Sequence, residues 1–258
     1  YSHRKSRIHG SPAWERDEGS ADRNLFTADS FSAGKDRQTL LSETLPGVLD
    51  YFQDCCTFES EQTGVGMEVL KEQKRAWVLS AWQVIVKRYP KLGENIKVTT
   101  IPYGFRGFIG MRNFILETMD GEKLAWANSY WSFINTETGL PEKLTPADTD
   151  PYDLGEKIEM DYAPRKIALP KEREVQNAFS VQKHHLDTNH HVNNCQYIRM
   201  AADHLPEDFK VGQLRVEYKR QAVLDNVIIP EVYMTENKEA VVLNAEDKEP
   251  YAVVEFTK

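Results

Sequence analysis

Apolar and polar residues follow two different periods along the first half of the chain. Over residues 45–58 the apolar positions recur three and four residues apart, a spacing that predicts a helix with one buried face. From residue 77 to 86 the pattern changes to the β-branched and aromatic runs that are typical of strands. Further runs of this kind occupy residues 98–101, 108–116 and 124–134, so we predict one helix followed by about four strands.

Asp120 and Gly121 separate the last two of these predicted strands. An Asp-Gly pair between two apolar runs is a strong hairpin signal, and it suits a type I′ turn. We therefore predict a tight hairpin of this type.

The second half repeats the order of elements. Residues 179–185 are predicted to form a strand, and a polar loop at 187–194 leads into a predicted helix over 196–205. Because a helix beside an antiparallel sheet buries its apolar stripe against one face of that sheet, each half should form a helix wrapped by strands. Two such units side by side can join their sheets, which predicts an α+β fold of two tandem units. The remaining strands of the second unit are predicted at residues 211–223, 227–235, 239–245 and 251–257.

Changes in composition place the boundaries between these units. Residues 1–23 are polar, charged and aperiodic, and they are interpreted as a tail or linker. Residues 24–136 form the first predicted unit. Residues 137–176 are rich in proline and glycine, which indicates a linker. Residues 177–258 form the second unit.

Composition excludes several classes of protein. The 258 residues are 40% apolar and 28% charged, unlike a fibrous or disordered chain. No run approaches the roughly 18 apolar residues of a membrane helix, so we expect no membrane span. The net charge of −8 disfavours a nucleic-acid partner.

The cysteines and the N-terminal region indicate the cell compartment. Three cysteines, two of them adjacent, do not suit a disulfide framework, and a reducing compartment fits better. The first 30 residues contain no apolar core of a secretory signal. We therefore expect a cytoplasmic protein.

The polar loop before the second predicted helix contains the strongest candidate site. Asp187, Asn189 and His191 are spaced by two, and alternate residues of an extended segment share a face, so we predict that these side chains converge. Asn193 or Asn194 can cap the following helix and leave backbone N–H groups beside the loop. Such groups stabilise an oxygen that gains negative charge during acyl transfer.

These residue types supply the groups that hydrolysis needs. His191 is a candidate general base or polarising group, since the ordinary histidine pKa is about 6.5. Asn189 can donate its amide N–H to a carbonyl oxygen, and Asp187 can orient a neighbour or hold a water. The sequence contains no G-x-S-x-G motif for a serine nucleophile.

Three other interpretations of this segment stay open. A histidine-rich loop is often plain solvated surface. A metal site could combine His185 and Asp187 with His191 or His204, although no histidine follows His204 to complete a distant ligand set, so we expect no metal and no cofactor. Cys195 at the predicted helix start is a candidate nucleophile, but its position favours a small buried residue.

Several segments together resemble the acyl-acyl-carrier-protein thioesterase family. The sequence DTNHHVNNCQYI at 187–198 resembles the family's D-x-N-x-H-V-N-N segment. Residues 45–58 are similar to the first helix of its bacterial branch, and residues 75–100 and 108–135 are similar to its first-half strands. The resemblance covers about residues 40–258.

This resemblance implies a double hot-dog fold and a thioester hydrolase. The implied reaction cleaves a fatty acyl thioester on acyl carrier protein, releases the free fatty acid and ends chain elongation in fatty acid biosynthesis. Asp187, Asn189 and His191 become the catalytic set, and Asn193 and Asn194 complete the motif. The implied partners are acyl carrier protein and a fatty acyl chain. A homodimer is also compatible with such a fold.

The chain departs from the family pattern after the second predicted helix. Family members often carry a glutamate in the following strand, where this chain has Gln221 followed by Ala222. Glutamine cannot accept a proton as a base, so Gln221 would at most orient a water. Base function would then fall on Asp187 or His191.

The family implies an acyl-chain cavity largely in the first hot dog. Because acyl carrier protein is acidic, we expect a basic surface where it docks. We expect first-half aromatic residues to line the cavity, with Trp82 and Trp126 as substrate-binding candidates beside Phe105, Phe108 and Trp131. Two alternatives to the implied activity are a non-catalytic acyl-binding hot-dog protein and an acyl-CoA thioesterase. The candidates for the basic surface are Lys183, Arg199, Lys210, Arg215, Lys219 and Arg220.

Overall fold

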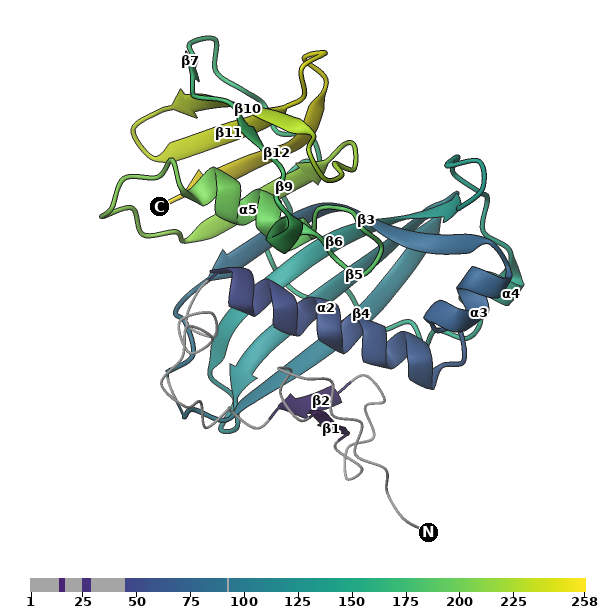
Figure 1. Ribbon diagram of the computed structural model, residues 1–258. Coiled ribbons are helices and arrows are strands. Elements are labelled where there is room, and N and C mark those ends of the chain that lie inside the picture. The colour runs from purple at the N-terminus through teal and green to yellow at the C-terminus, as the bar shows by residue number, and fades with distance from the viewer. Residues whose placement is uncertain (1–13, 17–24, 29–44, 92) are drawn as a thin grey trace.

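The computed structural model describes residues 14–16, 25–28, 45–91 and 93–258. The two longest of the four helices among these residues lie against one long antiparallel sheet (Figure 1). The helices are α2 (Leu45–Gln62), α3 (Met67–Glu72), α4 (Pro146–Thr149) and α5 (Asn194–Ala202), with a short 3-10 turn, η1 (Lys183–His185).

Twelve strands among the described residues form this sheet. In the first half they are β1 (Trp14–Arg16), β2 (Leu25–Ala28), β3 (Arg75–Val86), β4 (Ile96–Arg106), β5 (Ile109–Thr118) and β6 (Lys123–Asn135). In the second half they are β7 (Glu174–Val175), β8 (Phe179–Ser180), β9 (Gln213–Tyr218), β10 (Val227–Met234), β11 (Lys238–Asn244) and β12 (Pro250–Thr257).

The two units share one sheet through a single pair of strands. The order along the sheet is β1-β2-β4-β5-β6-β3-β9-β12-β11-β10-β7, and β8 also pairs with β10. Antiparallel pairing of β3 with β9 runs from Ala81 opposite Glu217 to Ile85 opposite Gln213. This confirms the prediction that two helix-and-sheet units join their sheets.

Helix α2 packs on the concave face of the first-half strands because its apolar stripe faces them. Val48, Leu49 and Phe52 are fully buried, and the Phe52 ring stacks on Phe114 of β5 at 5.1 Å between centroids. Burying each such side chain contributes roughly 1.5–3 kcal/mol. The predicted helix over 45–58 is confirmed, and it continues to Gln62.

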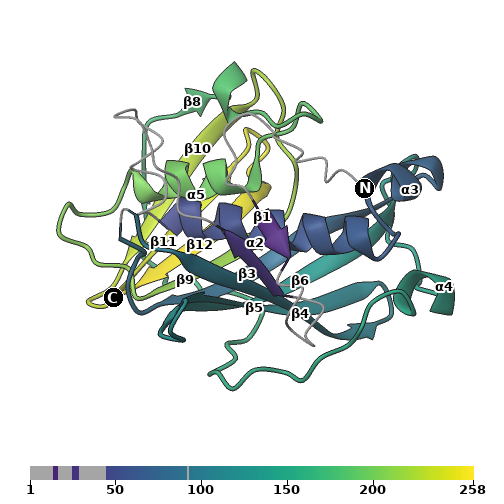
Figure 2. The same ribbon diagram turned by 90° about the horizontal axis from the view of Figure 1, so that it is seen from below.

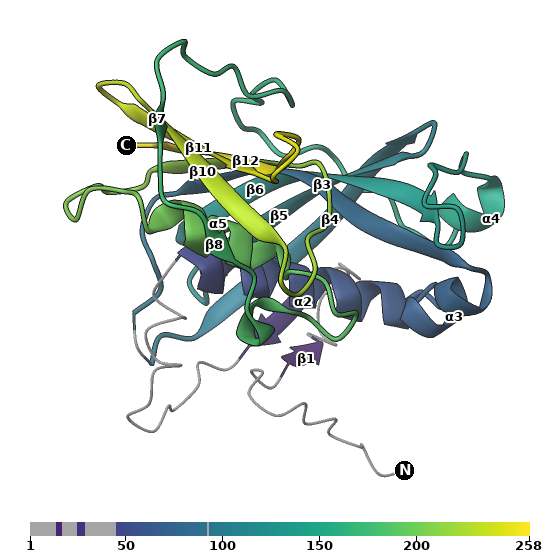
Figure 3. The same ribbon diagram turned by 45° about the horizontal axis from the view of Figure 1, so that its top comes forward.

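Helix α5 lies on the same side of the sheet as α2, over the second-half strands (Figures 2 and 3). Its buried residues, including Tyr197 and Ile198, belong to the same apolar core as the buried face of α2. The site loop at 187–193 therefore leads directly into a helix that packs beside α2.

Three local predictions are wrong. Trp14–Arg16 lies in the range expected to be a tail, yet it forms β1 against β2; the rest of residues 1–23 lies outside the described residues. Only Phe179 and Ser180 of the strand predicted at 179–185 are extended, and η1 follows.

At the Asp120-Gly121 turn only Gly121 has a positive φ, of 87°, whereas a type I′ turn needs two residues with positive φ. The N–H of Gly121 instead donates to Thr118 O at 3.0 Å, which closes a different turn.

The predicted linker over 137–176 crosses the outer face of the sheet, opposite α2 (Figure 2). The side chain of Gln83 donates to Asp161 O at 2.8 Å and accepts from the N–H of Ala163 at 2.9 Å. Tyr162 donates its hydroxyl to Asn113 at 2.9 Å. The outer face of the first unit is thus covered by its own chain.

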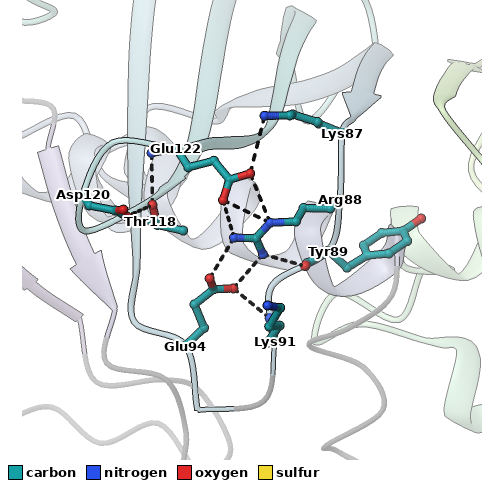
Figure 4. A network of polar contacts seen from close by, with 8 residues as sticks. All are labelled: Lys87, Arg88, Tyr89, Lys91, Glu94, Thr118, Asp120 and Glu122. Atoms are coloured by element: carbon teal, nitrogen blue, oxygen red, sulfur yellow. Dashed lines mark hydrogen bonds and ion pairs between the residues drawn. The ribbon is translucent and has the colours of Figure 1, made fainter.

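An ion-pair network fixes the connection between β3 and β4 to the β5–β6 hairpin (Figure 4). The guanidinium of Arg88 donates to both carboxylate oxygens of Glu94 at 2.8 Å. The same guanidinium donates to Glu122 at 2.6 Å. One arginine therefore ties together two segments that are distant in sequence.

Candidate active site

The loop that carries the predicted catalytic residues folds as a turn. Asp187 Oδ1 accepts from the N–H of Asn189 at 2.8 Å and of His191 at 3.1 Å. The N–H of Asp187 donates to His191 O at 2.8 Å, and His190 has a φ of 62°. The predicted extended segment is therefore wrong. The three residues are held near one another by a turn that Asp187 closes with its own side chain.

A segment after β9 supports this turn from one side. His191 pairs with Val223 in an isolated bridge, and the N–H of Val192 donates to Ala222 O at 2.9 Å. The N–H of Ala222 in turn donates to the Tyr197 hydroxyl of α5 at 2.8 Å. The turn is thus attached to both the sheet end and the helix.

Gln221 lies in this supporting segment rather than in a strand. Strand β9 ends at Tyr218, and the Gln221 side chain is exposed, with no hydrogen bond to any of the described residues. The expectation that residue 221 lies within the strand is therefore wrong. The contacts of the described residues do not bring its side chain to Asp187, Asn189 or His191.

The two asparagines after the turn have separate tasks. Asn193 is the N-cap of α5, and its Oδ1 accepts from the N–H of Cys195 at 2.8 Å. Asn194 begins the helix and directs its side-chain amide to Gln53 Oε1 on α2 at 3.3 Å. The N-terminus of α5, with the positive end of its dipole, therefore follows the turn within a few residues.

A cavity of about 660 Å³ lies between α2, α3 and the concave face of the first-half sheet. Thr188 and Asn189 of the turn form part of its wall. The structure thereby brings a side chain of the second unit to a cavity of the first. Most of the other lining side chains are apolar and include Val65, Met67, Leu70, Trp77, Phe105, Met111 and Trp131.

Two of the five aromatic residues expected along the cavity are found there, Phe105 and Trp131. Trp82 is 3% exposed and packs on Phe52 and Phe114, in the closed part of the core. Trp126 pairs in register with Ile115 while its neighbour Ala127 pairs with Phe114, so Trp126 lies on the opposite face of the sheet. Neither Trp82 nor Trp126 therefore lines this cavity. Phe108 is 40% exposed and does not line it either.

Sequence reasoning missed a buried ion pair on the cavity wall. Arg112 of β5 lines the cavity and pairs with Glu59 of α2, while its Nη1 also donates to Thr100 at 2.7 Å. Burial raises the pKa of Glu59, and the nearby Arg112 opposes that shift. Glu59 continues the apolar spacing of α2 by one more turn. Its place on the buried face of the helix could have predicted an ion pair, because a buried carboxylate requires a partner.

Cys195 does not have the environment of a nucleophile. The residue is 3% exposed, and burial raises the pKa of its thiol well above the ordinary value. The thiol is therefore protonated at neutral pH, whereas the attacking species would be the thiolate.

The histidines that suggested a metal site are not gathered with other ligands. Within residues 45–91 and 93–258 and the two short N-terminal strands, no group of three or more His, Cys, Asp or Glu is placed to hold a metal ion. His185 instead accepts from the N–H of Gln182 at its Nδ1, at 2.9 Å, and burial lowers its pKa. Within the same described residues, no helix has the length and apolar character to cross a membrane.

The predicted basic surface is partly neutralised. Arg215 is buried and pairs with Glu255 at 2.9 Å, so it belongs to the sheet rather than to the surface. Lys219 pairs with Glu217, and Arg220 pairs with Asp247 at 2.7 Å. Lys183 and Lys210 are exposed.

Comparison with known proteins identifies the family. The acyl-ACP thioesterase N-terminal domain matches residues 36–152, and the C-terminal domain of the same family matches residues 168–250. The chain therefore belongs to the acyl-ACP thioesterase family.

Its curated relatives are plant enzymes. An acyl-[acyl-carrier-protein] hydrolase of Cuphea viscosissima is 28% identical over 228 residues, which cover 82% of this chain and 54% of the relative. A palmitoyl-acyl carrier protein thioesterase of Arabidopsis thaliana is 25% identical over 225 residues, covering 80% and 53%. The chain thus spans about half the length of the curated relatives it matches.

Solved structures confirm the predicted double hot-dog fold. An acyl-ACP thioesterase of Bacteroides thetaiotaomicron superposes with a TM-score of 0.78 at 21% identity, covering 90% of this chain and 95% of that one. The 12:0-ACP thioesterase of Umbellularia californica gives a TM-score of 0.72 at 19% identity, with coverage of 90% and 95%.

Proposed function

We propose that this protein hydrolyses fatty acyl thioesters of acyl carrier protein, releasing the free fatty acid and so ending chain elongation. The observation that carries the proposal is the position of Asn189, a residue of the family motif, on the wall of a largely apolar cavity. An apolar cavity suits an acyl chain, and a polar group at its wall suits the thioester carbonyl. Membership of the family supports the same activity.

The two units have different roles in the proposed reaction. The first unit, residues 24–136, holds the acyl chain, and the second unit, residues 177–258, supplies the polar groups. The side-chain amide of Asn189 donates to the thioester oxygen, and the N-terminus of α5 stabilises the charge that this oxygen gains as water attacks.

Water is the proposed nucleophile. His191 takes a proton from it as the new C–O bond forms, and Asp187 holds the turn that presents Asn189 and His191. The tetrahedral intermediate then collapses, the C–S bond breaks and the carrier's thiolate leaves with the electron pair. His191 returns its proton to that sulfur, so the enzyme regains its starting state.

Alanine variants of the three turn residues test the proposal. We expect Asp187→Ala, Asn189→Ala and His191→Ala each to lower kcat/KM for acyl-carrier-protein thioesters by about 10²-fold or more. The control is His184→Ala, because His184 is exposed and lies outside the turn. Near-normal acyl release by the three variants would contradict the assignment.

The Asp187→Asn variant distinguishes the negative charge of this residue from the hydrogen bonds that it accepts within the turn. Asparagine retains an oxygen that can accept from the N–H groups of Asn189 and His191. If the charge of Asp187 is not needed, this variant keeps more activity than Asp187→Ala.

The same assay decides between the other interpretations. A non-catalytic acyl-binding protein would bind the thioester without turnover, and an acyl-CoA thioesterase would prefer the coenzyme A ester. Direct hydrolysis also requires that Cys195→Ser remain active and that no acyl group be trapped on Cys195.

Exposed lysines such as Lys183 and Lys210 would attract the acidic carrier protein, so higher salt should raise KM for the protein-bound substrate.

A further inference from the structure

Gln53 connects the helix of the first unit to the first turn of α5. It uses both ends of its side-chain amide. Its Oε1 accepts from Asn194 Nδ2 at 3.3 Å, and its Nε2 donates to Cys195 Sγ at 3.2 Å. Asn194 and Cys195 are the first two residues of α5.

Other contacts show that this first turn is held from several directions. The Tyr218 hydroxyl of β9 donates to Asn194 O at 3.1 Å. Cys195 Sγ donates to Pro46 O of α2 at 3.9 Å. The start of α5 is therefore fixed between α2 and the sheet of the second unit, and Gln53 makes the side-chain contact to Asn194 from α2.

The same helix carries part of the cavity wall. Cys56, Thr57 and Ser60 of α2 line the cavity and lie within two turns of Gln53. On the other side, α5 follows the turn that brings Asn189 to that cavity. Gln53 therefore lies where the acyl-holding unit meets the unit with the catalytic turn.

We propose that Gln53 is a positioning residue for the reaction. It holds the start of α5 in register with α2, and this keeps Asn189 and the helix N-terminus aligned with a thioester in the cavity. The inference rests on the proposed thioesterase function. The two adjacent asparagines of this chain then have different roles, since Asn193 caps the helix and Asn194 contacts Gln53.

The test is the Gln53→Met variant, which keeps the length of the side chain and removes both hydrogen bonds. Because a displacement of about 1 Å in a catalytic group can cost about 100-fold in rate, we expect kcat to fall about 10- to 100-fold. KM should stay within about two-fold, since the cavity lining is unchanged. Gln62→Met is the matched control, because Gln62 is an exposed glutamine on the same helix.

Two further variants distinguish positioning from simple loss of structure. Gln53→Glu keeps an oxygen that accepts from Asn194, and it should recover part of kcat relative to Gln53→Met. Adding Asn194→Ala to Gln53→Met should lower kcat no further, because the contact between the two residues is already lost. If Gln53→Met does not fold, Asn194→Ala gives the result instead, because it removes the same contact from α5.

Hydrogen exchange provides a readout without substrate. A peptide covering residues 187–198 should exchange several-fold faster in Gln53→Met than in the wild type, and Gln62→Met should leave it unchanged. Unchanged kcat and unchanged exchange in folded Gln53→Met would overturn the inference. If the wild type does not hydrolyse acyl-carrier-protein thioesters, the proposed function fails, and the exchange result still decides the role of Gln53.

Discussion

Arg112 illustrates how a single buried side chain shapes the cavity. It is 7% exposed, lines the cavity and is paired with Glu59, which is 2% exposed. Its guanidinium also lies 5.7 Å from the centre of the Tyr152 ring. This pair places a buried guanidinium on a largely apolar wall, and each partner requires the other.

Removing one partner should be far more costly than removing both. We predict that Arg112→Met lowers the free energy of unfolding by about 3–5 kcal/mol, because Glu59 is left as an uncompensated buried acid. The double variant Glu59→Met with Arg112→Met should recover most of that loss. Urea unfolding of the three proteins measures both values. A loss below about 1 kcal/mol in Arg112→Met would show that Glu59 does not depend on this partner.

At the scale of elements, the Arg88 network in Figure 4 joins the β3–β4 connection to the β5–β6 hairpin. The hydrogen bonds from Arg88 lower the pKa of Glu94 to about 2, from an ordinary value of 4.5. An acid whose pKa is depressed by folding stabilises the folded state above its ordinary pKa. That contribution is lost as the pH falls toward the folded-state pKa.

The Glu94→Gln variant should therefore show a pH-dependent loss of stability. We predict a decrease of up to about 1 kcal/mol at pH 7, because the pair is partly exposed. The difference from wild type should narrow between pH 4.5 and about pH 2. Urea unfolding at a series of pH values measures it, with the exposed Glu72→Gln as control. A difference that stays constant down to the lowest pH would contradict the role of this network.

The two longer helices, α2 and α5, and the long strands were predictable because their pattern depends on burial of one face. The spacing of Val48, Leu49 and Phe52 located α2, and the β-rich runs located β3 to β6. The turn at 187–191 was not predictable as a turn. Asp187 satisfies the backbone N–H groups of its own loop, and His190 adopts a positive φ that few side chains favour.

The sequence also could not predict on which face of the sheet a strand residue lies. Trp126 and Ala127 are neighbours on β6, and only the register with β5 shows which of them faces α2. Between Leu79 and Ala81 the register of β3 shifts, which changes the alternation along that strand. The cavity residues depend on these registers and on α3, a short helix that the hydrophobic pattern did not reveal.

For the whole molecule, the joined sheet explains how a cavity in one unit meets a turn from the other. Strand β3 pairs with β9, and α2 and α5 share one apolar core on the same face of the sheet. The cavity extends from the turn residue Asn189 to α3, where Leu70 forms part of the wall. An acyl chain bound there would have its thioester at the turn and its methyl end toward α3.

The chain-length profile of hydrolysis by Leu70→Trp tests this account most directly. The larger side chain shortens the cavity at α3, so we predict that the variant hydrolyses short acyl-carrier-protein thioesters at close to the wild-type rate and loses activity on long ones. Val69→Trp is the matched control, because Val69 lies on the same helix, is 38% exposed and does not line the cavity. An equal loss at every chain length, or an unchanged profile, would contradict the placement of the acyl chain in this cavity.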